Sequence, residues 1–326
     1  MAGEGGDQSI THSTISTNGI NMHVASIGAG PATILFLHGF PELWYTWRHQ
    51  LLSLSALGYR CIAPDLRGYG DTDAPSSPAK YTAFHIVGDL VGLLDALKID
   101  KVFLVGHDWG AAMAWYFCRL RPDRVTAVVN LSIPPLRQSH AFSLVDAFRA
   151  AYGDEYYFCR FQEVGKAEEE FAEVETGKMM VKLFTLFSKP DPPMVPRETG
   201  FRGLPDPPSL PSWLSEEDVK YYASKFKKTG FTGGLNYYRA FPLTGELMGP
   251  WAGGDCKYTV PAKFIVGDQD VAYGMVGLKD YIHGEEFKKE VPLLEEVVVM
   301  KGVPHFPNLV KPDEITQHIF DFIKRF

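Results

Sequence analysis

The chain has 326 residues, of which 45% are hydrophobic, and it carries a formal net charge of −7 at pH 7. This length suits one α/β domain with an insertion, while the negative charge opposes binding to a phosphate backbone, so we expect no nucleic-acid partner. The first twenty residues contain no apolar leader segment, and no run of about 18 apolar residues follows. We therefore expect a cytoplasmic protein that has no membrane-spanning segment.

Strands and helices are predicted to alternate over most of the chain. After a Gly-rich start that we expect to be disordered, residues 20–26 alternate apolar and polar side chains, which predicts an antiparallel edge strand. Unbroken apolar runs are typical of strands buried on both faces of a parallel sheet. Such runs lie at residues 32–37, 59–63, 101–105, 125–131, 262–266 and 294–300, and helical stripes lie at 84–97, 111–120 and 314–326. This order predicts an α/β fold in which a mostly parallel central sheet is flanked by helices.

Residues 136–245 interrupt the alternation with aromatic helical pieces and with dense prolines at 189–193 and 205–208. Proline removes a backbone donor and fixes φ, so these two stretches are expected to lack regular structure. We interpret the region as a helical cap inserted between two parts of the core, at residues 1–135 and 246–326. A separate second domain is the alternative, but the resumption of strands after the region favours an insertion.

Residues 106–110 (GHDWG) follow a predicted strand and precede a predicted helix, which is the context of a nucleophile elbow. The flanking glycines allow a sharp turn that presents Asp108 at a helix N-terminus, where backbone N–H groups favour negative charge. A carboxylate is already ionised at neutral pH and needs no base to become a nucleophile. The alternative is that Asp108 only caps the helix.

Two further motifs decide between these alternatives. Residues 38–41 (HGFP) follow the strand at 32–37, where hydrolases with such an elbow place one backbone donor of an oxyanion hole. The amides of Phe40 and Trp109 are therefore predicted to stabilise an oxyanion on the Asp108 carboxyl carbon. A simple tight turn with a cis Pro41 is a compatible interpretation.

The second motif is an acid followed by a histidine, each after a predicted strand. Asp268 and Asp270 follow the strand at 262–266, and His305 follows the strand at 294–300. The order nucleophile, acid, histidine is that of a hydrolase triad, so His305 is the predicted base. Asp270 is predicted to fix its tautomer, with Asp268 as the competing candidate or a loop cap.

These motifs resemble those of the soluble epoxide hydrolases of the α/β-hydrolase fold family, most of all the plant type, and the likeness runs from about residue 18 to the end. Haloalkane dehalogenases share the first two motifs, so the cap must distinguish the two. The resemblance implies that two tyrosines of the cap donate hydrogen bonds to the epoxide oxygen. The register of the sequence against the family motif assigns this role to Tyr157 and Tyr238. A shift of one position would give Tyr156 or Tyr237 instead. An oxirane needs such a donor because it has no good leaving group.

The resemblance also implies a group of residues that contact substrate or support a water chain beside the base: His38, Pro41, Glu42, His107 and Phe161. A glutamate at a helix start is equally explained by the helix dipole. The segment at 306–310 is more apolar than is expected of relatives, which leaves its role in ordering the histidine loop open.

The sequence thus predicts an epoxide hydrolase that makes vicinal diols through a covalent ester on Asp108. It would use no metal and no organic cofactor, accept a lipid-derived or aryl epoxide, and act as a monomer or homodimer. Two alternatives are a haloalkane dehalogenase and a ligand receptor without turnover. The intact set of Asp108, Asp270 and His305 argues against the receptor.

Overall fold

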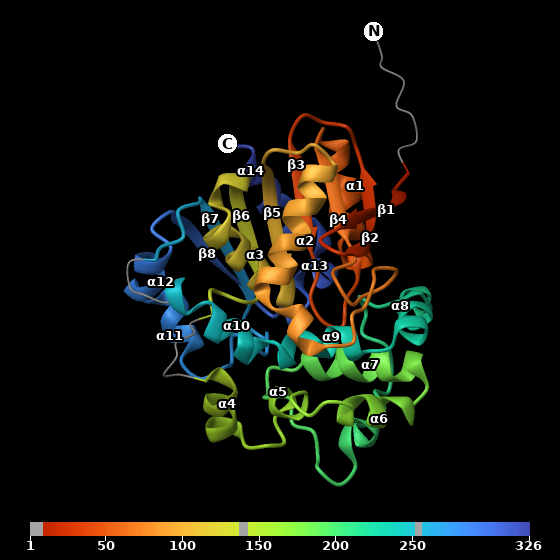
Figure 1. The fold of residues 1–326 in the computed structure, drawn as a ribbon. Coiled ribbons are helices and arrows are strands. Elements are labelled where there is room, and N and C mark those ends of the chain that lie inside the picture. Colours follow the sequence, from red (N-terminus) through yellow and green to blue (C-terminus); the bar gives the residue numbers. More distant parts are fainter. Residues whose placement is uncertain (1–8, 137–142, 252–255) are drawn as a thin grey trace.

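The computed structural model describes residues 9–136, 143–251 and 256–326 (Figure 1). Its centre is an eight-stranded sheet in the order β1-β2-β4-β3-β5-β6-β7-β8. The strands are β1 (Thr11–Thr17), β2 (Ile20–Ile27), β3 (Thr33–Leu37), β4 (Arg60–Pro64), β5 (Val102–His107), β6 (Val125–Leu131), β7 (Ala262–Gly267) and β8 (Leu294–Met300). All neighbours from β4 to β8 pair in parallel, which confirms the predicted mostly parallel sheet. The Gly-rich start lies outside the described residues.

One strand prediction was wrong in its position. Residues 20–26 belong to β2, which pairs antiparallel with both β1 and β4 and is therefore not an edge strand. The edge is β1, whose sequence THSTIST exposes almost every side chain. A strand without an apolar face carries no periodic signal, so only its pairing with β2 reveals it.

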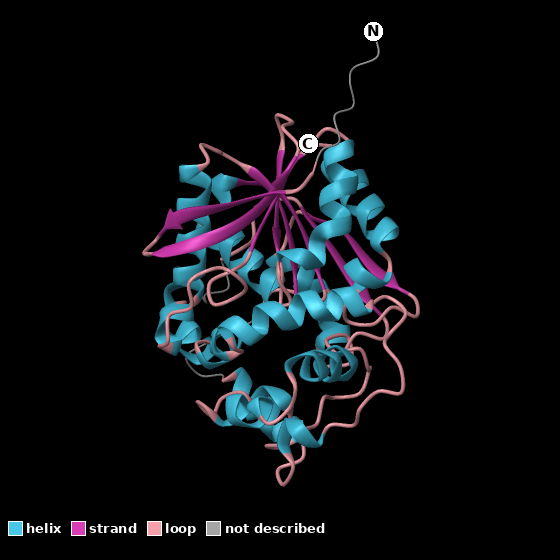
Figure 2. Cartoon of the chain, turned by 90° about the vertical axis from the view of Figure 1, so that its right-hand side faces the viewer, coloured by secondary structure: helices cyan, strands magenta, loops and turns pink. Residues whose placement is uncertain are grey.

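The sheet separates two hydrophobic clusters, because successive side chains of a strand point to opposite faces. Leu35 and Leu37 of β3 enter a cluster with apolar residues of α2 and α3, whereas Ile34 and Phe36 enter one with α1 and α14. The helices are α1 (Arg48–Ala56), α2 (Ala83–Ala96), α3 (Trp109–Leu120) and α14 (Pro312–Ile323), and Figure 2 shows helices on both faces of the twisted sheet. Burial on both sides explains why these strands are apolar throughout.

Between β6 and β7 the chain forms seven α-helices within the described residues, which we call the helical segment. They are α4 (Leu144–Tyr152), α5 (Tyr157–Arg160), α6 (Lys166–Ala172), α7 (Thr176–Phe187), α8 (Glu216–Thr229), α9 (Thr232–Arg239) and α10 (Phe241–Leu247). The helical segment lies beyond one end of the sheet, below it in Figure 1. Both proline-dense stretches lack helix and strand, as predicted. The cap boundaries at 136 and 245 stay a prediction, and residues 137–142 lie outside the described part.

The remaining helices follow β7 and β8: α11 (Leu278–His283), α12 (Glu285–Glu290) and α13 (Pro307–Val310). The loop after β7 and the loop between β8 and α13 leave the same edge of the sheet as the turn after β5, because these three strands are parallel. Side chains that are far apart in the sequence therefore meet at the edge of the sheet that faces the helical segment.

Candidate active site

The turn between β5 and α3 places Asp108 at the edge of the sheet. Asp108 has φ 51° and ψ −122°, a conformation that few non-glycine residues adopt. A Cβ atom on Gly110 would lie 2.1 Å from the carbonyl oxygen of Leu37, so α3 begins in direct contact with the end of β3. Such strain at a strand-to-helix turn is characteristic of a nucleophile elbow.

The HGFP motif forms the opposite wall of this turn. Phe40 donates its N–H to Oδ1 of Asp108 at 2.8 Å, and the Phe40–Pro41 peptide is cis. A Cβ atom on Gly39 would lie 2.4 Å from the same carboxylate oxygen, so only glycine permits this approach. Trp109, the other predicted oxyanion donor, is the first residue of α3.

His305 lies between two carboxylates. Its Nε2 is 3.6 Å from Oδ2 of Asp108, and its Nδ1 is 2.8 Å from Oδ1 of Asp270. Burial alone would lower the pKa of His305, but the charges of Asp270 and Asp108 outweigh it and raise this pKa to about 10. Burial likewise opposes ionisation of Asp270, yet His305 and the Ala272 N–H lower the pKa of that carboxyl.

Asp268 does not contact the histidine. Its Oδ1 accepts a 2.7 Å hydrogen bond from the N–H of Gly302, which joins the loop after β7 to the loop after β8. Of the two acidic candidates, the structure thus brings Asp270 to His305 and leaves Asp268 as a loop cap.

A cavity of about 50 Å³ lies beside Asp108. Its walls come from α3, α4, α5, α9 and two loops, and they are formed by Asp108, Trp109, Ala112, Ile133, Leu136, Leu144, Phe148, Tyr157, Phe158, Tyr238 and Met275. Most of these side chains are apolar or aromatic, which is usual for a small-molecule site with few polar groups. The polar side chains of the lining are one carboxylate and two phenols, together with the indole of Trp109.

The register of the tyrosines follows from this lining. Tyr157 and Tyr238 line the cavity, and their ring centroids are 6.0 Å apart. Tyr237 points elsewhere, since its hydroxyl donates to the carbonyl of Arg67 at 3.0 Å. Tyr156 is fully buried and lies outside the lining. Burial raises the pKa of both cavity phenols well above 10, so each carries its proton at neutral pH.

Known proteins match this combination of fold and site closely. A family model for the alpha/beta hydrolase fold matches residues 32–169. Epoxide hydrolase 2 of Siraitia grosvenorii is 65% identical over 319 residues, which is 98% of this chain and 100% of that protein. The chain belongs to the epoxide hydrolases. It is therefore a hydrolase that acts on ether bonds.

Solved structures of plant enzymes also match the chain, and they assign this epoxide hydrolase to the plant type. A mutant epoxide hydrolase of Vigna radiata has 55% identity and a TM-score of 0.93, and the match covers 98% of this chain and 99% of the other. Epoxide hydrolase I of potato, Solanum tuberosum, has 50% identity and a TM-score of 0.92 over 98% of this chain and 100% of the other. These relatives favour the predicted activity over a haloalkane dehalogenase or a receptor.

A buried polar network lies beside Asp108 and His305 of this epoxide hydrolase. His107 places Nδ1 2.7 Å from Oε2 of Glu42 and Nε2 2.6 Å from the carbonyl oxygen of His305. Burial would raise the pKa of Glu42, but His107, Thr46 and the Gly39 N–H lower it to about 2. Glu42 and His107 thus hold the backbone on either side of Asp108, at Gly39 and at His305.

Three other predicted residues, His38, Pro41 and Phe161, lie outside the cavity lining. His38 is fully buried, with Nδ1 2.9 Å from the Gly39 carbonyl oxygen and Nε2 accepting the Leu66 N–H at 3.0 Å. Phe161 is also fully buried and packs against Tyr238, with ring centroids 4.8 Å apart. Their predicted contact with substrate or water stays a prediction, while their observed contacts support the loop and the phenol.

Sequence analysis missed residues that support His305. Ser132 directly follows β6, has φ 74°, and places Oγ 3.2 Å from Nδ1 of His305. Its position at the end of a parallel strand was the available signal. Asn308 donates to Oγ1 of Thr46 at 3.0 Å, and Thr46 donates to Glu42 at 2.5 Å. Asn308 therefore orders the histidine loop despite the apolar character of its neighbours.

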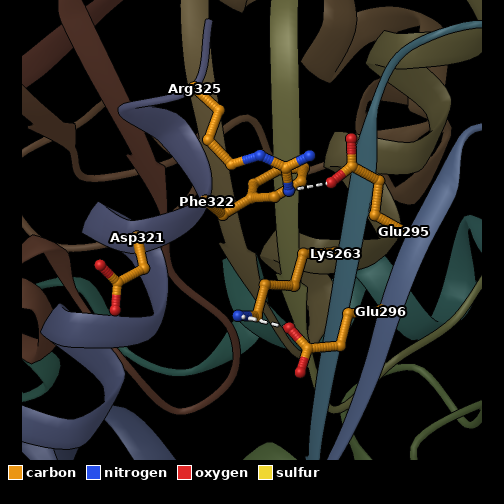
Figure 3. Close-up of a pocket in the computed structure, with 6 residues that line it drawn as sticks. All are labelled: Lys263, Glu295, Glu296, Asp321, Phe322 and Arg325. Carbon is orange, nitrogen blue, oxygen red and sulfur yellow. Dashed lines mark hydrogen bonds and ion pairs between the residues drawn. The ribbon is translucent and has the colours of Figure 1, made fainter.

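A second pocket of about 560 Å³ lies at the start of β7. Figure 3 shows the residues that line it. Asp270 lies beyond the opposite end of that strand. It is lined by Lys263, Glu295, Glu296, Asp321, Phe322 and Arg325. Lys263 forms a 2.9 Å ion pair with Glu296, and Arg325 pairs with Glu295. These charges offset one another, and the pocket contains none of the predicted site residues.

Over the described residues, no helix has both the length and the apolarity of a membrane span.

Proposed function

We propose that the enzyme opens epoxides through a covalent ester on Asp108 and releases vicinal diols. The observation that carries the proposal is the unequal environment of the two carboxylate oxygens. Oδ1 accepts the Phe40 N–H at 2.8 Å, whereas Oδ2 lies 3.6 Å from Nε2 of His305. Oδ2 would attack one oxirane carbon, and Oδ1 would remain at the backbone donor as the ester carbonyl oxygen.

In the first step, the bond from Oδ2 to carbon forms as the C–O bond of the oxirane breaks. The departing oxygen gains negative charge, and Tyr157 and Tyr238 would donate hydrogen bonds to it. These phenols are the polar groups that the cavity presents opposite Asp108. A protonated phenol stabilises a developing alkoxide more than it stabilises the neutral ether, so the contact lowers the barrier.

Ester formation would also change the protonation of His305. The negative charge of Asp108 helps to raise the pKa of this histidine, and that charge disappears when the carboxylate is esterified. The proton that His305 then releases balances the proton that the opened alkoxide takes up. The neutral imidazole, oriented by Asp270, becomes the base for the second step.

In the second step, His305 would take a proton from water, whose oxygen attacks the Asp108 carboxyl carbon. The oxyanion on Oδ1 would be stabilised by the amides of Phe40 and Trp109. Collapse breaks the bond between the carboxyl carbon and Oδ2, and the diol leaves with a proton from His305. The narrow apolar cavity supports a lipid-derived or aryl epoxide as the small-molecule substrate.

The source of the diol oxygen tests this proposal. With enzyme in excess over styrene oxide in ¹⁸O-labelled water, the diol of a single turnover should contain no label, because its new oxygen comes from Oδ2 of Asp108. Mass spectrometry of the peptide that contains Asp108 should then show one incorporated label. Label in the diol of the first turnover would mean that water attacks the epoxide directly, and the proposal would be wrong.

A further inference from the structure

Two consecutive tyrosines of α9 lie in different surroundings. Tyr238 lines the cavity, whereas Tyr237 is buried against the core, where its hydroxyl donates to the carbonyl oxygen of Arg67 at 3.0 Å. Successive residues of an α-helix project about 100° apart around its axis. Anchoring one of them therefore fixes the direction in which the next one points.

The acceptor of this hydrogen bond is itself held rigidly. Arg67 is almost fully buried and forms a two-pronged ion pair with Asp89 of α2, with Nε at 2.7 Å and Nη2 at 2.5 Å from the carboxylate oxygens. Asn18, in the turn between β1 and β2, donates to the same carboxylate at 2.8 Å. Bidentate pairs of this kind restrict geometry strongly. The Arg67 backbone thus belongs to the rigid core rather than to a loose loop.

The backbone of α9 also touches the core directly, at two glycines. A Cβ atom on Gly233 would lie 2.1 Å from the carbonyl oxygen of Gly68, and one on Gly234 would lie 2.7 Å from the ring of Phe40. The start of α9 is therefore fixed at van der Waals distance from the Arg67 loop and from the HGFP turn. This contact sets the distance of the helix from the core, whereas side-chain hydrogen bonds, such as those of Tyr237 and Arg239, resist its rotation about its own axis.

We propose that Tyr237 is a positioning residue that sets this rotation through its hydrogen bond to the Arg67 carbonyl. By doing so it aims the Tyr238 hydroxyl at the oxirane oxygen. Tyr237 does not line the cavity, although its ring centroid lies 6.0 Å from that of Trp109, which does. In this proposal its hydroxyl acts through Tyr238. The inference rests on the proposed role of Tyr238 as a hydrogen-bond donor in ester formation.

A double-mutant cycle with Tyr237→Phe and Tyr238→Phe tests the inference, because it measures whether one hydroxyl acts through the other. The measured quantity is the single-turnover rate of ester formation with styrene oxide at saturation. We expect Tyr237→Phe to lower this rate about tenfold in the otherwise unchanged enzyme and less than about twofold in the Tyr238→Phe background. The rate of ester hydrolysis should be unchanged, since the phenols take no part in that step.

Tyr116→Phe is the matched control. Tyr116 is a buried tyrosine of α3 whose hydroxyl has no hydrogen-bond partner among the described residues, and its removal should leave both rates unaltered. Thermal midpoints of all variants establish that each one folds, which is expected because every change removes a single hydroxyl group.

The outcomes separate the inference from the proposed function. No slowing by Tyr237→Phe, or equal slowing in both backgrounds, would overturn the positioning role while leaving Tyr238 as the donor. If Tyr238→Phe itself leaves ester formation unchanged, the proposed role of that phenol fails, and the positioning role fails with it. A loss that disappears in the Tyr238→Phe background supports both.

Discussion

The two sides of the cavity are held by different forces. On the nucleophile side, Asp108, His305 and Asp270 are joined by polar contacts to one another and to the backbone. On the phenol side, Tyr157 and Tyr238 are held by ring packing, with Tyr238 5.0 Å from Trp109 between ring centroids. The nucleophile side is built on strand ends, and the phenol side is built on α5 and α9 of the helical segment.

This difference follows from charge. A buried charge costs several kcal/mol unless hydrogen bonds or an opposite charge offset its desolvation, so the nucleophile side needs partners at fixed distances. A neutral phenol has a smaller desolvation cost, so aromatic packing can hold its ring without a charged partner. We therefore expect the nucleophile side to tolerate less change than the phenol side, and three predictions test this comparison.

The largest effect is expected from His305→Gln, which retains a hydrogen-bonding side chain but removes the base of the second step. Steady-state diol formation should fall about 10³-fold or more, while ester formation on Asp108, assisted by the phenols, continues. Mass spectrometry of intact protein should then show the enzyme heavier by the mass of one epoxide. His49→Gln, at an exposed histidine of α1, should accumulate no such adduct. Failure of the adduct to appear in His305→Gln would contradict the assigned base.

A smaller effect is expected from Gly39→Ala, which alters the backbone frame of the nucleophile side. The new Cβ would meet Asp108 Oδ1 at 2.4 Å, so the carboxylate or the turn must shift. We expect ester formation to slow about 100-fold and the free energy of unfolding to fall by about 1 to 3 kcal/mol. Gly177→Ala is the control, because its nearest neighbour, at 3.1 Å, is the flexible carboxylate of Glu175. Equal effects of the two changes would refute a special role for Gly39.

The smallest effect is expected on the thermal midpoint when a change of pH alters the charge of His305 or Glu42. His305 has a pKa raised from 6.5 to about 10 in the folded protein, so its stabilising contribution is present below pH 6.5 and is lost as pH rises toward 10. Glu42 has a pKa lowered from 4.5 to about 2, so its contribution is present above pH 4.5 and is lost as pH falls toward 2. Calorimetry should show the thermal midpoint falling on both sides of this window, by about 5 °C on the alkaline side. His305→Gln should flatten the alkaline decline, and an unchanged decline would contradict the pairing of His305 with the two carboxylates.

Sequence predicted the nucleophile side well because its signals are local. The strand before Asp108 is apolar throughout, glycines flank the turn, and the acid and histidine follow later strands in order. Parallel strands bring their carboxyl ends to one edge, so the order of these residues along the chain implies that they meet. The structure brings Asp270 rather than Asp268 to His305, and two carboxylates so close in sequence could be separated only by seeing which one reaches the imidazole.

The phenol side was predicted only as far as a resemblance allowed. Helical periodicity cannot tell which of Tyr237 and Tyr238 faces a cavity when both are buried, because a helix that is apolar on most of its surface has no distinct outer face. Among the residues that support the site from elsewhere, Ser132 had only its place after a parallel strand as a signal, and Thr46 had none. They are ordinary polar residues whose importance depends on which atoms lie within 3.2 Å of them.

By itself, the sequence determined the parallel sheet and predicted the elbow at Asp108 and its candidate partners Asp270 and His305, because strand burial and strand-end motifs act over a few neighbouring residues. Only the tertiary structure decided that β1 lies outside β2 and that Tyr238 rather than Tyr237 faces the cavity. It also showed that a buried network joins Glu42 and His107 to the histidine loop. Those features depend on contacts between segments far apart in the chain, and the energy of such contacts is set by distance and direction rather than by the identity of adjacent residues.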